Sequence, residues 1–202
     1  MHGMRSWLAL ATLVGFANSV AFAQDSTKAA PTASEFAAPE HVGRYTRTEM
    51  HDYGKPELGV AYQYRLPAHN PDSAFATFYI YQRDSNQRTL SADSLLKSQG
   101  AGFKEALEVM RRRGDYDLYR VAFEASDSVM VDGAWKIPGY HLAYVFRRGQ
   151  TTAASFLYLF VSGNTLLEVR GTVPAERFQN TDLPSFAHDV VAQAAKTSHS
   201  SH

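Results

Sequence analysis

The amino-acid sequence predicts an α+β fold, in which a single antiparallel meander sheet carries two helices packed on one face. Two series of short segments alternate apolar and polar residues between turn residues, which is typical of antiparallel strands. Two longer segments, 90–114 and 183–196, repeat their apolar residues with helical spacing instead. Because strands and helices follow one another in separate runs, we expect the helices to stack on one sheet.

The strongest strand signal is the hairpin 152–174. Two apolar runs flank Gly163 and Asn164, and glycine at the first position of a two-residue loop favours a type II′ turn. This register gives one strand face without any charge, made of Phe156, Tyr158, Phe160, Leu167, Val169 and Gly171. The opposite face carries Glu168 and Arg170 beside its leucines. We therefore expect the helices on the first face and partial solvation of the second.

The other strands are predicted from the same alternation. Before the first helix they are 42–53, 59–66 and 74–82, with a turn at 67–71. After it they are 116–124, 128–131, 134–137 and 140–147. Asp132 and Gly133 are a strong turn signal, and Pro138 with Gly139 is expected to break the strand run.

The first helix is predicted over 90–114. Its apolar stripe consists of Phe103, Ala106, Leu107 and Met110. Ser91 suits the N-cap, and Gly114 suits the position just beyond the C-terminus. Gly100 and Gly102 are poor interior residues, so we expect them to bend or split the helix.

The last helix is predicted over 183–196, after a single helical turn at 175–178. Its apolar stripe consists of Leu183, Phe186, Ala187, Val190, Val191 and Ala194. Thr181 or Asp182 is expected to cap it, and Pro184 lies in the first turn, where its missing N–H costs nothing. This stripe is expected to close the core against the apolar face of the sheet.

Composition divides the chain into four segments. Residues 1–23 combine a positive residue, a short apolar run and an Ala-x-Ala ending, which predicts a secretory signal peptide cleaved before Gln24. An uncleaved anchor helix is the alternative. Residues 24–40 are rich in alanine, proline, serine and threonine and predict a flexible leader. A single domain over 41–196 and a disordered tail over 197–202 are expected to follow.

The cysteine content fits a protein that is stable through its core alone. The 202 residues include no cysteine, so the chain has no disulfide and no cysteine that could carry a lipid anchor. We expect a periplasmic or secreted protein with no membrane anchor in the mature chain.

Charge and motifs exclude several classes of function. Basic and acidic residues both number 20, which gives no electrostatic case for nucleic acid or anionic lipid as a partner. The sequence has no dinucleotide-binding, Walker or zinc-protease motif and no nucleophile elbow. Its eight histidines are scattered, so we expect no metal site, no cofactor and no catalytic residue.

One strand face offers candidate ligand-binding residues. Glu168 and Arg170 lie two apart on it, close enough to pair. If the turn at 148–150 has an even number of loop residues, Tyr140 and Tyr144 join the same face. A carboxylate, a guanidinium and two phenols around an apolar floor can bind a small polar ligand. The alternative is a salt bridge on a solvated face with no binding role.

The order of elements resembles the PsbP/Mog1-like fold. The resemblance lies in a tyrosine- and arginine-rich opening hairpin, a middle helix, an antiparallel meander, the hairpin FLYLFVSGNTLLEVRGTVP and a closing helix. It covers about 41–196 in element order and implies a non-enzymatic accessory or binding protein. It carries no site residue over to this chain.

These observations together favour an exported binding or accessory protein that acts without covalent chemistry. Its partner is expected to be an unknown small molecule or an envelope protein. Two alternatives stay open. One is an envelope hydrolase whose acid–base residues come together from distant segments, and the other is a scaffold for envelope assembly that binds protein through an exposed strand edge.

Overall fold

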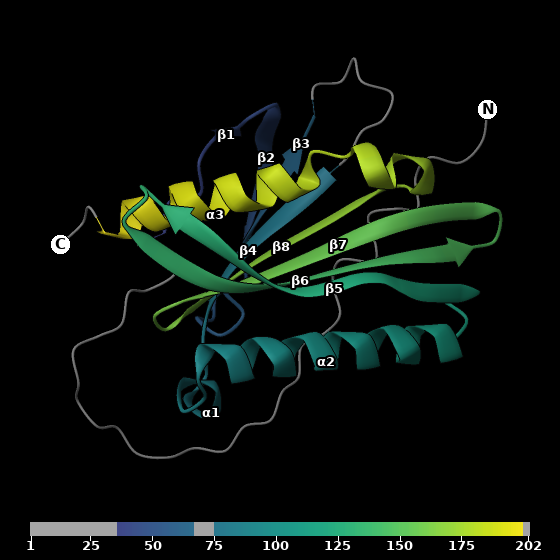
Figure 1. Ribbon diagram of the computed structural model, residues 1–202, viewed down its shortest axis with the longest axis horizontal. Coiled ribbons are helices and arrows are strands. Elements are labelled where there is room, and N and C mark those ends of the chain that lie inside the picture. The colour runs from purple at the N-terminus through teal and green to yellow at the C-terminus, as the bar shows by residue number, and fades with distance from the viewer. Residues whose placement is uncertain (1–35, 67–74, 200–202) are drawn as a thin grey trace.

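The computed structural model describes residues 36–66 and 75–199, which form three layers. Figure 1 shows the sheet in the middle, with α3 above it and α2 below. The predicted signal peptide, the leader up to residue 35, the predicted turn at 67–71 and residues 200–202 of the tail lie outside the described residues.

Eight strands form one antiparallel sheet in the order β1-β2-β3-β4-β8-β7-β6-β5. The strands are β1 (His41–Val42), β2 (Tyr45–Asp52), β3 (Val60–Arg65), β4 (Phe75–Gln82), β5 (Leu118–Val131), β6 (Trp135–Arg148), β7 (Thr151–Ser162) and β8 (Thr165–Pro174). The predicted α+β class and single antiparallel sheet are confirmed. The sheet is two meanders joined where β4 pairs with β8, because the middle helix carries the chain from β4 to the far edge at β5.

The helices are α1 (Ser85–Arg88), α2 (Ala92–Arg112) and α3 (Leu183–His199), with a 3₁₀ helix η3 at Ala175–Asn180. Ser91 caps α2 by accepting the backbone N–H of Ser94, and Gly114 follows the helix with a φ of +80°. The expectation that Gly100 and Gly102 bend or split the helix is wrong, since α2 is one continuous element through both.

The predicted hairpin and its register are confirmed. Ser162 pairs with Thr165 across a two-residue loop, and Gly163 has a φ of +57°. The predicted break at Pro138 is wrong, because β6 continues through it. β6 pairs with β7 only from Gly139 onward, so the missing N–H of Pro138 falls where the strand has a single neighbour.

The two long helices lie on opposite faces of the sheet, which corrects the expectation that both pack on one face. α3 covers the predicted apolar face, including Phe156 and Phe160. α2 covers the other face, where its Leu95 and Leu96 pack with the group that contains Leu157. Both faces of the central hairpin are apolar, so each needs its own covering layer.

The packed domain extends beyond the predicted limits of 41–196. Phe36 and Ala38 are buried in the same core as α3. The backbone N–H of Ala37 donates to Thr197 Oγ1 over 3.1 Å, which joins the two ends of the domain. These contacts correct the assignment of 36–40 to a flexible leader and of Thr197 to a disordered tail.

Candidate functional site

The four predicted site residues lie on one face of the sheet, the face that α2 partly covers. The turn between β6 and β7 contains two residues, Gly149 and Gln150, as that prediction required. Tyr140 is opposite Leu159, and Leu159 is opposite Glu168. Strand β7 therefore stands between the tyrosines of β6 and the charged pair of β8. The structure separates the predicted site into two clusters.

The first cluster is built around the carboxylate of Glu168. This residue is only 4% exposed. Its Oε1 accepts a hydrogen bond from Arg170 Nε, and its Oε2 accepts one of 2.7 Å from the hydroxyl of Tyr81. The expectation of a salt bridge on a solvated face is therefore wrong. A buried carboxylate that accepts one hydrogen bond from a guanidinium and one from a phenol is fixed in place. It also fixes the positions of Arg170 and Tyr81.

The guanidinium of Arg170 lies at the boundary between this cluster and the surface. Its Cζ atom is 5.3 Å from the ring centre of Tyr79 and 5.3 Å from that of Phe103. The side chain remains 38% exposed. Burial alone would lower the pKa of Arg170, but the negative charge of Glu168 outweighs it and the pKa is raised. Arg170 thus stays cationic, and its two Nη groups make no hydrogen bond to a described residue.

The tyrosines that complete this cluster are Tyr79 and Tyr81, not Tyr140 and Tyr144. β4 pairs with β8 and places Tyr79 directly opposite Glu168. Burial, followed by the charge of Glu168, raises the pKa of Tyr81 well above its ordinary value, so its hydroxyl remains a donor. The alternation of β4 in the sequence places both tyrosines on one face, but it does not reveal that β8 is the neighbour.

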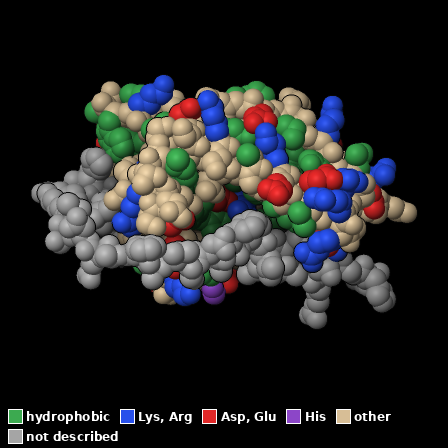
Figure 2. All heavy atoms as spheres, turned by 90° about the horizontal axis from the view of Figure 1, so that it is seen from below, with side chains coloured by type: hydrophobic (Ala, Val, Ile, Leu, Met, Phe, Trp, Pro, Cys, Tyr) green, Lys and Arg blue, Asp and Glu red, His purple; other side chains and the backbone are tan. Residues whose placement is uncertain are grey.

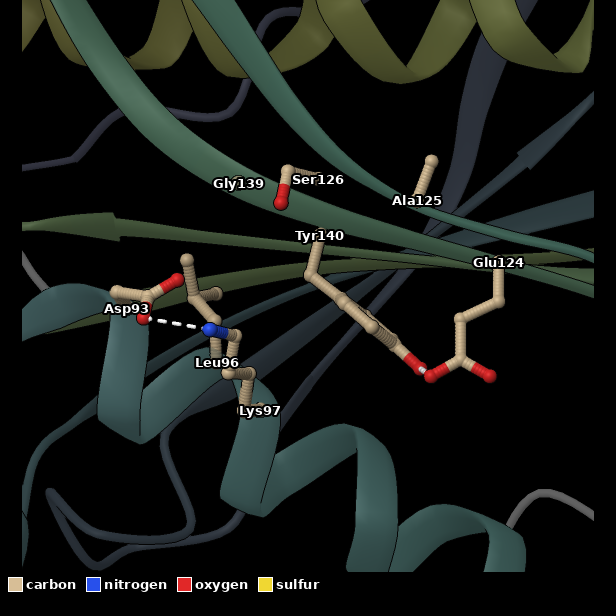
Figure 3. Close-up of a pocket in the computed structure, with 8 residues that line it drawn as sticks. All are labelled: Asp93, Leu96, Lys97, Glu124, Ala125, Ser126, Gly139 and Tyr140. Carbon is tan, nitrogen blue, oxygen red and sulfur yellow. Dashed lines mark hydrogen bonds and ion pairs between the residues drawn. The ribbon is translucent and has the colours of Figure 1, made fainter.

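The second cluster contains Tyr140 and lies on the other side of α2. The Tyr140 hydroxyl donates to Glu124 Oε1 over 2.8 Å, and Lys104 Nζ donates to the same oxygen over 2.8 Å. A pocket of about 180 Å³ lies beside Tyr140 and Glu124, between α2 and the strands β5 and β6. Figure 3 shows the residues that line it. Tyr144 is buried elsewhere, against Phe103 and Phe146.

A third polar cluster lies beneath α3 and joins two histidines that the sequence left apart. His188 Nε2 is 2.9 Å from Asp127 Oδ2, and the ring of His141 stacks on Tyr158 with 4.1 Å between ring centres. Within 36–66 and 75–199, no three or more histidine, aspartate or glutamate side chains are arranged as a metal site. The signal that could have found this cluster is the alternation of β5, β6 and β7, which puts Asp127, His141 and Tyr158 on one face.

Charges on the α2 side of the molecule are mixed. Figure 2 shows lysine, arginine, aspartate and glutamate side chains interspersed over the described part of this face. Within the described ranges, no helix combines the length and apolar character needed to cross a bilayer.

Comparison with known proteins gives similarities of fold. No protein-family model matches the chain, and no curated protein sequence matches it. A solution structure of PsbP from the cyanobacterium Synechocystis sp. PCC 6803 matches with 12% identity and a TM-score of 0.48, over 74% of this chain and 82% of the other. A protein of unknown function from Pseudomonas aeruginosa matches with 15% identity and a TM-score of 0.39, over 71% and 91%.

The Ran-binding protein Mog1p of Saccharomyces cerevisiae also matches, with 11% identity and a TM-score of 0.36 over 78% of this chain and 88% of the other. PsbP and Mog1p are proteins whose fold the order of elements resembles, and both TM-scores here are below 0.5. These matches concern the fold alone and say nothing about the ligand or activity of this chain.

Proposed function

We propose that the protein is an exported, non-enzymatic binding module whose ligand presents a hydrogen-bond acceptor, such as a carboxylate, to Arg170. The observation that carries this proposal is the placement of the Arg170 guanidinium. It is held by the buried Glu168 and by the rings of Tyr79 and Phe103, while 38% of the side chain remains exposed. Export rests on the sequence of residues 1–23.

The arrangement favours binding because the guanidinium is ordered before any ligand arrives. A free arginine loses rotamer freedom when it binds, and this loss weakens the complex. Glu168 accepts a hydrogen bond from Nε of Arg170, and the rings of Tyr79 and Phe103 restrict the plane of the guanidinium. Arg170 has therefore already lost this rotamer freedom when the protein folds. The remaining Nη donors form a planar pair that matches a carboxylate or phosphate.

The chemistry of the neighbours favours an acceptor over a donor as the ligand group. The oxygens of Glu168 already accept from Arg170 and Tyr81. Burial raises the pKa of Tyr79 more than the nearby Arg170 lowers it, so its phenol keeps its proton. The groups that remain available around Arg170 are therefore mainly donors.

The test uses succinate as the probe and backbone amide NMR shifts as the readout. Succinate is expected to shift amides of β4 and β8 near Tyr79 and Arg170 in the native protein. The matched variant replaces Glu168 with Gln and Arg170 with Met together, so that no buried carboxylate is left unpaired. It should keep a cooperative melting transition and lose the shifts.

Arg120→Met serves as the control, since it removes one exposed arginine from β5 and leaves the cluster intact. It should bind succinate as the native protein does. Equal binding by the Glu168→Gln, Arg170→Met variant, or the absence of any shift in the native protein, would overturn the proposal.

A further inference from the structure

A row of side chains leads away from the Arg170 cluster across the sheet. Tyr79 lies opposite Glu168 on one side and opposite Ala61 on the other, and Ala61 lies opposite His51. Directly opposite residues of antiparallel strands point to the same face, so the whole row shares the face of Arg170. The row therefore continues from the charged pair of β8 to β2.

Tyr53 stands beside this row at the end of β2. Its ring centre is 4.4 Å from that of His51, with 73° between the ring planes. Its backbone N–H donates to the carbonyl of Gly59 over 3.1 Å, which keeps the residue next to β3. Burial is the main cause that raises the pKa of Tyr79, and the Tyr53 phenol is close enough to add to this rise. Tyr53 and Tyr79 therefore lie on the two sides of β3.

The chain between the two tyrosines carries small residues. Gly59 has no side chain, and Ala61 is buried with only a methyl group. Tyr53 and Tyr79 are half-buried and His51 is exposed, so ring surface remains accessible on both sides of β3. Helix α2 packs mainly on β5, β6 and β7, and these rings lie beyond it. A flat group that approaches from solvent can therefore reach both tyrosines.

The spacing of the strands suits one further aromatic ring between these two. β2 and β4 are separated by β3 and hence by about 9–10 Å, since neighbouring strands are about 4.8 Å apart. Ring centres in contact are about 4.5–7 Å apart. A third ring above Ala61 would therefore contact Tyr53 and Tyr79 at once. It would lie near Arg170, because the Tyr79 ring centre is 5.3 Å from the guanidinium Cζ.

The charges along the row favour a monoanion over a dianion. Arg170 and Glu168 form an ion pair beside Tyr79, so their charges cancel. One carboxylate can still pair with the Nη groups of Arg170. A second carboxylate at the β2 end would approach Glu49, which lies two positions before His51 on the same face. Like charges repel there, whereas an uncharged ring meets aromatic surface.

We propose that the ligand held by Arg170 is an aromatic monocarboxylate, whose carboxylate pairs with the guanidinium and whose ring lies between Tyr79 and Tyr53. This inference rests on the proposed function and names the class of ligand for the same site. The guanidinium supplies the anchor, and the two tyrosines supply the preference for an aromatic ring.

The test compares 3-phenylpropionate with 3-cyclohexylpropionate, which carries the same carboxylate on a saturated ring of similar size. Backbone amide NMR shifts of the full chain give both affinities. Both compounds should shift amides of β4 and β8 near Arg170. 3-Phenylpropionate should bind about three- to tenfold more tightly, the gain expected from aromatic contacts. It should also shift the amides of Tyr53 and Ala61.

Tyr53→Leu removes the aromatic ring and keeps an apolar side chain, so it should bring the two affinities to within about twofold of each other. Tyr53→Phe should keep the preference. Phe123→Leu removes an exposed ring from β5, outside this site, and should also keep it.

Two results would overturn this inference and leave the proposed function standing. They are equal binding of the two compounds to the native protein with shifts near Arg170, and a preference that survives in Tyr53→Leu. Shifts from neither compound would overturn the inference and the proposed function together.

Discussion

Asp127 on β5 and His188 on α3 are joined by a contact of 2.9 Å between Oδ2 and Nε2, which ties the last helix to the edge of the sheet. The hydrogen bond with Asp127 raises the pKa of His188. Burial would raise the pKa of Asp127, but the hydrogen bonds from His188 and from the backbone of Ser128 lower it. The pair is therefore most stable with both groups charged.

The stability that this pair contributes is expected to depend on pH. The contribution of His188 is complete below its unfolded pKa, about 6.5, and is lost as the pH rises through its higher folded value. The contribution of Asp127 to stability is present above its unfolded pKa, about 4, and is lost as the pH falls through its lower pKa in the folded protein. His188→Asn should lower the free energy of unfolding by about 1 kcal/mol or less at pH 5.5, and by a smaller amount at pH 8.5.

Urea unfolding at the two pH values measures this difference. His51→Asn, on an exposed part of β2, is the matched control for the loss of one histidine. A His188→Asn penalty that grows between pH 5.5 and 8.5 would contradict the assignment.

His141 is expected to act in the opposite direction. Burial lowers its pKa to about 4, although Asp127 partly opposes this. The His141 imidazole therefore binds a proton more tightly in the unfolded chain than in the folded protein. The free energy of unfolding falls as the pH decreases from about 6.5 toward 4. The full effect is about 1–3 kcal/mol, from about 1.4 kcal/mol for each pKa unit with allowance for partial exposure. His141→Phe, which retains stacking on Tyr158, should remove this loss.

Imidazole NMR titration separates the two histidines. The resonance that disappears in His141→Phe should titrate near pH 4, and the one that disappears in His188→Asn should titrate above the ordinary histidine value. A His141 signal that titrates near 6.5 would show that the ring is solvated.

The two glycines of α2 provide a matched pair of substitutions. A Cβ atom at Gly100 would lie 2.6 Å from the Tyr140 ring, whereas one at Gly102 would meet nothing within 4 Å. Gly102→Ala should stabilise the protein by up to about 1 kcal/mol, because alanine is the better helix former. Gly100→Ala should destabilise it by about 1–3 kcal/mol through overpacking. Thermal unfolding of both variants checks this, and equal stabilisation would show that Tyr140 moves freely.

The contact of α3 with the first meander depends on Phe186. Its ring centre lies 4.5 Å from that of Tyr45 and 5.1 Å from that of Tyr64. Phe186→Asp would bury an unpaired carboxylate among these rings and is expected to prevent folding. Ser185→Asp, at the exposed neighbouring position, should change stability by less than about 0.5 kcal/mol. Circular dichroism during heating measures both, and a cooperative transition in Phe186→Asp would contradict this packing.

Features set by neighbouring residues were predicted correctly from the sequence. The register of the β7–β8 hairpin follows from Gly163 in its turn, and the pairing of Glu168 with Arg170 follows from their spacing on one strand. The burial of Glu168 did not follow, because it depends on elements far away in the chain. Tyr81, which donates to Glu168, is 87 residues from it.

The same limit explains the error in placing the helices. The uncharged face of the hairpin predicts a cover for Phe156 and Phe160, and α3 supplies it. The opposite face holds Leu157 and Leu159, which also have to be buried. Partial solvation was predicted for this face because it carries the charges of Glu168 and Arg170. Tyr81 and Arg170 satisfy the Glu168 carboxylate, so this face can also be buried.

The sequence by itself determined the fold class, most strand and helix limits, the turn at Gly163 and the faces on which side chains lie, because alternation, capping and turn preferences act between close neighbours. Only the tertiary structure decided that β4 lies beside β8, that the two helices cover opposite faces, and that Tyr79 rather than Tyr140 joins Arg170. Strand edges offer the same backbone groups to every neighbour, so their order depends on how the whole chain buries its apolar surface.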